Sequence, residues 1–208
     1  MTGGAHPDGR RGEHHTVGSV RPTSVEPPNQ SEAAVSRVLQ GKCVVITGSG
    51  RGLGAAYARS ASSAGAAVVV NDIDEEPVDD VVAEIRAGGG EAVGVVADVS
   101  TWAGADEAVT ACVDTFGQID GLVNNAGIFS MGRLEEMEPD DVAALVATNI
   151  LGTAFCGSHA ARHMVSRGAG SIVNVTSGAH AGIPRMGVYG ATKGAVTVRM
   201  SSTRHDDR

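Results

Sequence analysis

Three residues near the end of the sequence have the types and spacing that proton transfer at an alcohol or carbonyl requires. Tyr189 and Lys193 are four positions apart, so on a helix they project from one face. An ammonium near a phenol favours the phenolate and lowers a pKa that is ordinarily about 10, which makes tyrosine usable as an acid or base near neutral pH. Ser177 follows a short apolar run, and its hydroxyl can hold a substrate oxygen. Each residue taken singly is more often structural.

A glycine-rich stretch is the second candidate for chemistry. The sequence TGSGRGLG at 47–54 follows an apolar run and precedes a helical pattern, and it fits T-G-x-x-x-G-x-G rather than G-x-G-x-x-G. Phosphate binding needs a tight turn, backbone N–H groups without Cβ obstruction and a facing helix N-terminus, and four glycines meet these needs. Simple close packing of helix on sheet is the alternative. The predicted cofactor-binding residues of this turn are Thr47, Gly48, Ser49, Gly50, Arg51, Gly52, Leu53 and Gly54.

Asp72 indicates which nucleotide this turn would hold. It ends the second apolar run, about twenty residues past the glycines, where a carboxylate can bind both ribose hydroxyls. A 2′-phosphate would meet a like charge there, so NAD is favoured over NADP. Arg51 argues the other way, because it can pair with that phosphate. A solvated loop acid beside Asp74 is the plainer alternative for Asp72.

The elements that must position these residues alternate strictly between strand and helix. Such alternation predicts βαβ units and a single-domain α/β fold, a doubly wound parallel sheet with ligands beyond the carboxyl ends of its strands. Apolar runs ended by glycines predict strands at 42–48, 66–72, 91–99, 119–127 and 170–178. Apolar periodicity predicts helices at 53–65, 75–90, 105–117 and 139–168, and a further helix from 187.

Composition excludes several other classes of function. A formal net charge of -8 argues against a nucleic-acid-binding surface, which needs clustered Lys and Arg. The sequence contains no run of 18 apolar residues, so no membrane span is expected. The N-terminus lacks the apolar core of a secretory signal, and a cytoplasmic protein is therefore expected. Cys43, Cys112 and Cys156 are widely spaced, which predicts buried thiols rather than a metal or redox site.

The two ends of the chain differ from its middle. Residues 1–36 are polar and without period, which predicts a disordered extension, and His14 and His15 are read there as solvated side chains rather than metal ligands. Residues 37–200 form the predicted nucleotide-binding domain. Residues 201–208 have the sequence SSTRHDDR, which lacks the apolar period of a buried helix. They are expected to be an irregular tail.

Taken together, these motifs resemble the short-chain dehydrogenase/reductase family, whose members have one Rossmann-like domain. The pieces occur in family order over about residues 40 to 200: the glycine motif at 47–54, Asp72, Asp98-Val99, Asn124-Asn125-Ala126-Gly127, Asn149, Ser177, Tyr189 and Lys193. The resemblance implies an NAD- or NADP-dependent oxidoreductase acting on a small alcohol or ketone, with the cofactor supplying the hydride chemistry.

The resemblance also implies a role for each position. Tyr189 would be the general acid/base, Lys193 would lower its pKa and bind the nicotinamide ribose, and Ser177 would polarise the substrate oxygen. Asn149 would hold a water that connects Lys193 to a proton relay. Asn124 would tie neighbouring strands together. Asp98 and Val99 would contact the adenine, and Asn125 the adenosine ribose region. Ala126, Gly127, Tyr189 and Lys193 would also belong to the cofactor-binding residues.

The sequence departs from the family after the Tyr–Lys helix. Family members continue with further strands, which leads us to expect a C-terminally truncated member whose last strands are missing and whose strand at 170–178 is an open edge. The alternative function is therefore an inactive or weakly active dinucleotide-binding fragment. An epimerase or dehydratase of the extended relatives is less favoured, since it would show a different glycine turn and a larger C-terminal domain. Family members form homo-oligomers through the long helix and the Tyr–Lys helix, and shortening the latter would weaken that contact.

Overall fold

A five-stranded parallel sheet forms the centre of the protein in the computed structural model, which describes residues 37–197. The strands are β1 (Cys43–Ile46), β2 (Ala67–Asp72), β3 (Ala92–Val96), β4 (Gly121–Asn124) and β5 (Ser171–Asn174). Their order in the sheet is β3-β2-β1-β4-β5, and every neighbouring pair is parallel. The predicted doubly wound α/β fold is therefore confirmed, including all five expected strands.

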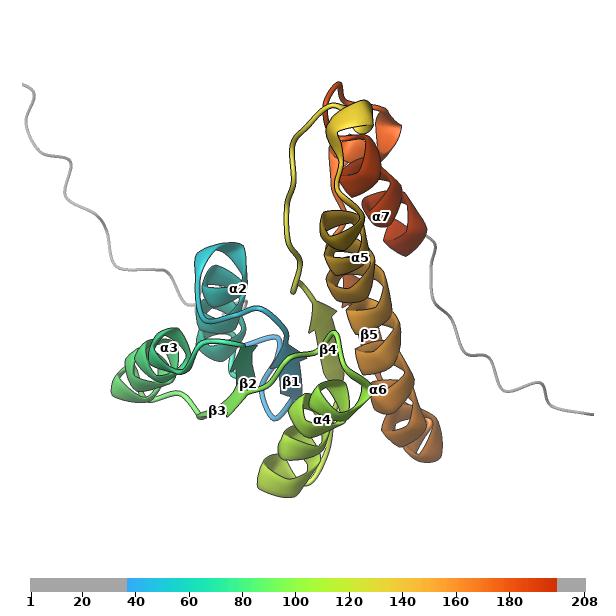
Figure 1. The fold of residues 1–208 in the computed structure, drawn as a ribbon. Helices are drawn as coiled ribbons and strands as arrows, with labels where there is room; N and C mark the ends of the chain where they lie inside the picture. The colour runs from blue at the N-terminus through green and yellow to red at the C-terminus, as the bar shows by residue number, and fades with distance from the viewer. Residues whose placement is uncertain (1–36, 198–208) are drawn as a thin grey trace, which may run out of the picture.

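Helices cover both faces of this sheet, as Figure 1 shows. On one face, α2 (Gly52–Ser63) and α3 (Glu75–Ala87) enclose a core that includes Ile46, Val68 and Val70. On the other face, α4 (Trp102–Phe116) and α6 (Thr153–Arg167) pack over Val45, Val69 and Leu122. Alternate residues of β1 and β2 thus point into opposite cores, which is why these strands read as continuous apolar runs.

Local sequence signals explain several element boundaries. The hydroxyl of Thr101 accepts a hydrogen bond from the amide of Gly104, so α4 begins three residues before the predicted Ala105. Gly117 ends the same helix with a φ of 78°, a conformation that glycine adopts without strain. The three cysteines are buried free thiols, as predicted, and burial raises the pKa of Cys112 and of Cys156 to about 12.

The predicted helix at 139–168 is a continuous helical rod with a change of winding in its middle. It consists of α5 (Pro139–Val146), a π-helical turn η2 (Ala147–Gly152) and α6. By length and composition alone, Pro139–Arg167 could also cross a membrane, with a mean hydropathy of 1.3 over its most apolar window. Because α6 packs against α4 and the sheet, and core helices of soluble proteins pass the same test, this is weak support for a span.

The segments after β4 and β5 lie together beyond the sheet. The short helices η1 (Leu134–Glu136) and η3 (Gly178–Ala181) and the helix α7 (Gly187–Thr197) gather there, as Figure 1 shows. The amide of Gly132 donates a hydrogen bond to the carbonyl of Arg185 at 2.9 Å, which joins the two connections. Among the described strands, β5 is an edge, and Val173 on it is 53% exposed. The predicted extension at 1–36 and the tail at 201–208 lie outside the described residues.

Candidate functional site

The glycine turn joins β1 to α2 at the carboxyl edge of the sheet. Gly48 has a φ of +61°, and a Cβ added there would lie 2.7 Å from the Cα of Ala126. A Cβ at Gly54 would overlap the carbonyl oxygen of Gly48 and lie 2.6 Å from Asn125 Nδ2. A Cβ at Gly52 would instead meet no atom within 4 Å, so this glycine leaves open space at the start of α2. The turn is therefore packed on its inner side and open on its outer side.

The N-terminus of α2 has the features of an anion-binding end. Its N-cap residue, Arg51, makes no side-chain capping hydrogen bond, and the first turn contains no acidic residue. Backbone N–H groups at a helix start and the positive end of the helix dipole both favour a negative group. These observations fit a dinucleotide diphosphate at the predicted turn.

Thr47 connects the glycine turn to the loop after β4. Its buried hydroxyl accepts hydrogen bonds from the amides of Asn125, at 3.1 Å, and Ala126, at 3.0 Å. The side-chain amide of Asn125 donates in return to the carbonyls of Thr47, at 3.0 Å, and Gly48, at 2.8 Å. These four bonds make the turn and the loop one unit, so the residues predicted from two separate motifs share one site.

Asp72 lies beside the turn, at the end of β2. One of its carboxylate oxygens accepts a hydrogen bond from the amide of Gly50 at 3.0 Å, and the other accepts from the amide of Ile73 at 2.9 Å. A Cβ at Gly50 would lie 3.0 Å from that carboxylate, so glycine is what allows the close approach. The carboxylate is therefore held in place at the edge where a nucleotide ribose would lie.

The predicted pair after β3 divides between surface and core. The side chain of Asp98 is exposed, and its carboxylate accepts a hydrogen bond from the amide of Ser100 at 2.9 Å. Val99 is buried and packs in the core shared with α4 and α6. Among the pair, the side chain of Asp98 is the one available to a ligand.

Lys193 brings the second half of the site against the first. Its ammonium donates a hydrogen bond to the carbonyl of Val175 at 2.9 Å, and a Cβ added at Gly127 would lie 3.4 Å from its Nζ. Gly127 follows Ala126, the residue packed on Gly48. Lys193 is 6% exposed, and burial lowers its pKa from the ordinary 10.5. A buried cation thus lies next to the loop that the glycine turn contacts.

Asn149 fixes the position of α7 from the π-helical turn. Its side-chain oxygen Oδ1 accepts a hydrogen bond from the backbone amide of Ile128 at 2.9 Å. Its side-chain nitrogen Nδ2 donates to the carbonyl of Ile128 at 3.0 Å and to the hydroxyl of Thr192 at 2.9 Å. Thr192 precedes Lys193 on α7 and was not singled out by the sequence. π-helical turns are rare in proteins, but those that occur are often found at functional sites. This one places the buried side-chain amide of Asn149 between two segments of the site.

Tyr189 and Ser177 are both half-buried near the start of α7. The ring of Tyr189 makes an edge-to-face contact with Phe129, with ring centroids 5.0 Å apart. The hydroxyl of Ser177 accepts a hydrogen bond from the amide of Ala179 at 3.2 Å, so it caps η3. α7 packs on η3, since a Cβ at Gly190 would lie 2.5 Å from the carbonyl oxygen of Ala179. This packing brings Tyr189, Lys193 and Ser177 to the same end of the molecule.

A cavity of about 730 Å³ lies at the opposite edge of the sheet, lined by Lys42, Gly65 and Glu91 among others. These residues precede the strands rather than follow them, so this cavity is separate from the predicted site. Among the residues at 37–197, no cluster of three or more His, Cys, Asp or Glu is close enough to hold a metal ion. The candidate site is therefore the carboxyl edge described above.

Comparison with known proteins places this arrangement in a family. The model of the short chain dehydrogenase family matches residues 42–207. An uncharacterized oxidoreductase of Thermotoga maritima is 42% identical over 159 residues, which cover 76% of this chain and 62% of the relative. A solved short chain dehydrogenase/reductase from Burkholderia phymatum, in complex with NAD, is 37% identical with a TM-score of 0.75, over 76% of this chain and 57% of that one.

A second solved structure is a short chain dehydrogenase from Burkholderia cenocepacia in complex with NADP. It is 35% identical with a TM-score of 0.71, over 76% of this chain and 65% of that one. The present chain thus spans less than two thirds of the length of each of these proteins. The extent of the family match, together with the sheet order and the glycine turn, shows that the chain belongs to the short chain dehydrogenase family.

Proposed function

We propose that this chain binds a nicotinamide dinucleotide, NAD in preference to NADP, at the glycine turn, and that it supports hydride transfer between this cofactor and a small alcohol or ketone. The observation that carries the proposal is the buried ammonium of Lys193 against the loop of Gly127 and Ala126, which itself packs on Gly48. The turn proposed to bind phosphate and the helix that carries Tyr189 and Lys193 would thereby belong to one site.

The inner residues of the turn fit such a cofactor. Added Cβ atoms at Gly48 and Gly54 would collide with neighbouring backbone, so these two positions require glycine, and the start of α2 has no side-chain cap that would compete with a phosphate. The carboxylate of Asp72, held by two backbone amides, would accept hydrogen bonds from the ribose hydroxyls. The same negative charge would repel a 2′-phosphate, which is the reason for the preference for NAD.

The residues of α7 would perform the proton transfer. The bound nicotinamide would supply the hydride chemistry. Tyr189 would exchange a proton with the substrate oxygen, and Ser177 would hold that oxygen by a hydrogen bond. Lys193 places a positive charge one helical turn from Tyr189, which stabilises the phenolate left after proton donation. Asn149 would act as a positioning residue, because its bonds to Ile128 and Thr192 fix α7 relative to the loop after β4.

The purified 208-residue chain allows a direct test with matched phenols. NAD binding would be measured by calorimetry, and oxidation of a panel of small alcohols by the absorbance of the reduced cofactor. Tyr189→Phe should retain NAD binding and lose at least a hundredfold in turnover, the order of magnitude of general acid–base catalysis. Tyr57→Phe removes the chain's other phenol, on the exposed side of α2, and should change neither quantity. Absence of NAD binding by the unaltered chain, or full turnover by Tyr189→Phe, would contradict the proposal.

A second candidate function is dinucleotide binding without turnover. It is favoured by a groove of about 550 Å³ on the sheet face beside β5, lined by apolar residues that include Ile46, Val123 and Val173. This groove leaves β5 and the connection to α7 uncovered on that face, and catalysis requires side chains held within about 0.5 Å of productive geometry. NAD binding with no turnover on any alcohol or ketone of the panel would support this function instead of the first.

A further inference from the structure

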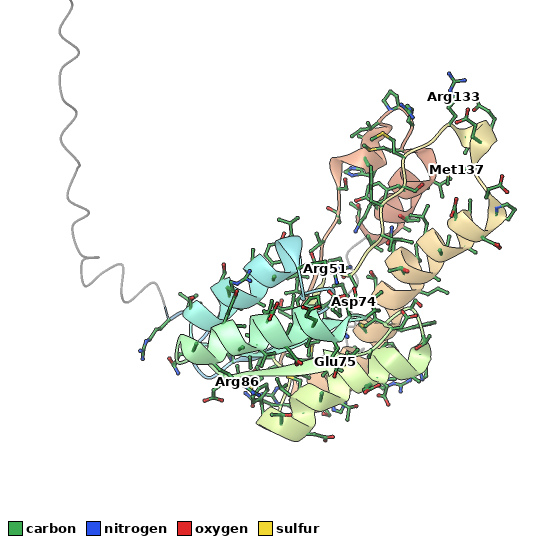
Figure 2. All side chains as sticks on the ribbon, turned by 60° about the vertical axis from the view of Figure 1, so that its left-hand side comes forward. Arg51, Asp74, Glu75, Arg86, Arg133 and Met137 are labelled. Atoms are coloured by element: carbon green, nitrogen blue, oxygen red, sulfur yellow. The ribbon has the colours of Figure 1, made fainter. Side chains whose placement is uncertain are left out.

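An ion pair beside the predicted ribose site joins two loops of the nucleotide end. The guanidinium Nη2 of Arg51 contacts the carboxylate Oδ2 of Asp74. Arg51 precedes α2 on the glycine turn, and Asp74 precedes α3, two residues after Asp72. Figure 2 shows Arg51 and Asp74 next to one another, at the adjoining ends of their two helices. Both side chains are more than half exposed, so the contact lies on the surface that a nucleotide would approach.

Arg51 is the residue of this turn that could attract a 2′-phosphate. A guanidinium binds phosphate through two parallel hydrogen bonds and stays charged at all physiological pH values. In this structure the guanidinium already forms an ion pair with the carboxylate of Asp74. Glu75 and Glu76 follow in the first turn of α3, so the surroundings of Arg51 are acidic beyond its direct partner. A phosphate would have to displace Asp74 and face these carboxylates.

Asp74 is the N-cap residue of α3, yet its side chain makes no capping hydrogen bond to the backbone of that helix. The contact of this side chain among the described residues is the one with Arg51. Asp72, by contrast, accepts hydrogen bonds from Gly50 and Ile73, so a substitution of Asp72 would disturb the turn itself. Selectivity can therefore be altered at Asp74 without changing the backbone of the site.

We propose that Asp74 is a specificity-determining residue that occupies and neutralises Arg51, so that the chain discriminates against dinucleotides bearing a 2′-phosphate. The inference rests on the proposed function, because it concerns the same nucleotide site. It adds a second source of discrimination to that of Asp72. Asp72 repels the 2′-phosphate, and Asp74 engages the guanidinium of Arg51, which would otherwise offset this repulsion. An Arg51 released from this pair would bind NADP more tightly and leave NAD unaffected.

The test compares nucleotide affinities of the full 208-residue chain by calorimetry. Asp74→Asn keeps the shape of the side chain and removes its charge, and NADP should then bind about tenfold more tightly, with NAD affinity unchanged within about twofold, the scale expected for one exposed charge-assisted contact. Adding Arg51→Gln to Asp74→Asn should abolish the gain. Raising the salt concentration should also reduce it, because the surface contact is screened.

Glu76→Gln is the matched control, since it removes one neighbouring acid that has no contact with Arg51 in the described structure. A gain for Glu76→Gln equal to that for Asp74→Asn would show that general negative charge is responsible and would overturn the inference. Unchanged NADP affinity in Asp74→Asn would overturn it too, and retained NAD binding in the same sample would leave the proposed function standing. If the unaltered chain bound neither nucleotide, the proposed function itself would fail.

Discussion

The ammonium of Lys193 donates a hydrogen bond to the carbonyl of Val175, so α7 is attached to the residue that follows β5. The bond places a charged group in a position where it is 6% exposed. Burial disfavours the charged form of an amine, which is why the pKa of Lys193 lies below 10.5. The proposed catalytic cation is thus held at a cost in folding free energy, and this cost can be measured.

Lys193→Met keeps the length of the side chain and removes its charge. Since the folded pKa is lowered, the unfolded chain binds the proton more tightly, and between the folded pKa and 10.5 the stability of the native chain rises with pH. Below that window, Lys193 is charged in both states and its contribution is constant. The difference between the free energy of unfolding of the native chain and that of the variant should therefore increase as pH approaches 10.5. Urea unfolding at several pH values measures it, and a difference that stays flat up to 10.5 would contradict the burial argument.

Thr47→Val tests the connection between the glycine turn and the loop after β4. Valine has the same shape but leaves the amides of Asn125 and Ala126 without their acceptor. The expected loss is roughly 1–3 kcal/mol in the free energy of unfolding, together with weaker NAD binding. Thr47→Ser keeps the hydroxyl and should retain most of both. Equal behaviour of the two variants in denaturation and calorimetry would show that the hydroxyl is not what joins the segments.

Gly54→Ala tests the close packing inside the turn. The added methyl would collide with the carbonyl of Gly48 and the amide of Asn125, so backbone must shift. Overpacking of this kind costs about 1–3 kcal/mol, and the displaced turn should bind NAD at least tenfold more weakly. Gly88→Ala is the matched control, because a Cβ there meets its nearest atom at an ordinary 3.4 Å. Thermal unfolding and calorimetry on both variants distinguish a local clash from a general effect of adding a methyl group.

The sequence was sufficient to predict the sheet and its helices because those signals are local. Runs such as Cys43–Ile46 are apolar, β-branched and ended by glycine, and they occur at the strands of the structure. The positions of the glycine turn and of Asp72 at the carboxyl ends of neighbouring strands could also be predicted, since their spacing follows from one βαβ unit. Helix starts were less accurate: α4 begins at Trp102 because the Thr101 hydroxyl caps it, which the apolar pattern does not show.

Contacts between distant segments could not be predicted in the same way. The amide of Asn149 meets the hydroxyl of Thr192, 43 residues later, only because α7 packs on the π-helical turn. The amide of Asn124 donates to Asn174 Oδ1 at 2.9 Å, so it ties β4 to β5 as the family resemblance implied. The π-helical turn contains no proline, and its one glycine, Gly152, stands at its end rather than at Asn149. The chemical roles of Tyr189, Lys193 and Ser177 stay predictions, and Tyr189→Phe is the variant that tests the acid–base role directly.

Asp120→Asn tests how the strands are held at the edge opposite the site. Burial alone would raise the pKa of Asp120, but the amide of Cys43, at 3.0 Å, and the nearby Arg167 and Lys42 lower it below 3.8. Because the folded pKa is lowered, the carboxylate stabilises the fold above about pH 3.8, and this contribution is lost as pH falls through the folded pKa.

At neutral pH, Asp120→Asn should therefore reduce the free energy of unfolding by roughly 1–3 kcal/mol, since asparagine offers one acceptor oxygen and no charge to partners that remain in place. The gap between native chain and variant should close as pH falls below 3.8. Asp114→Asn, on the exposed face of α4, should change stability by less than about 0.5 kcal/mol at either pH. Urea unfolding at neutral and acid pH checks all three values. A gap that persisted in acid would mean that the shape of the side chain, rather than its charge, joins β1 to β4.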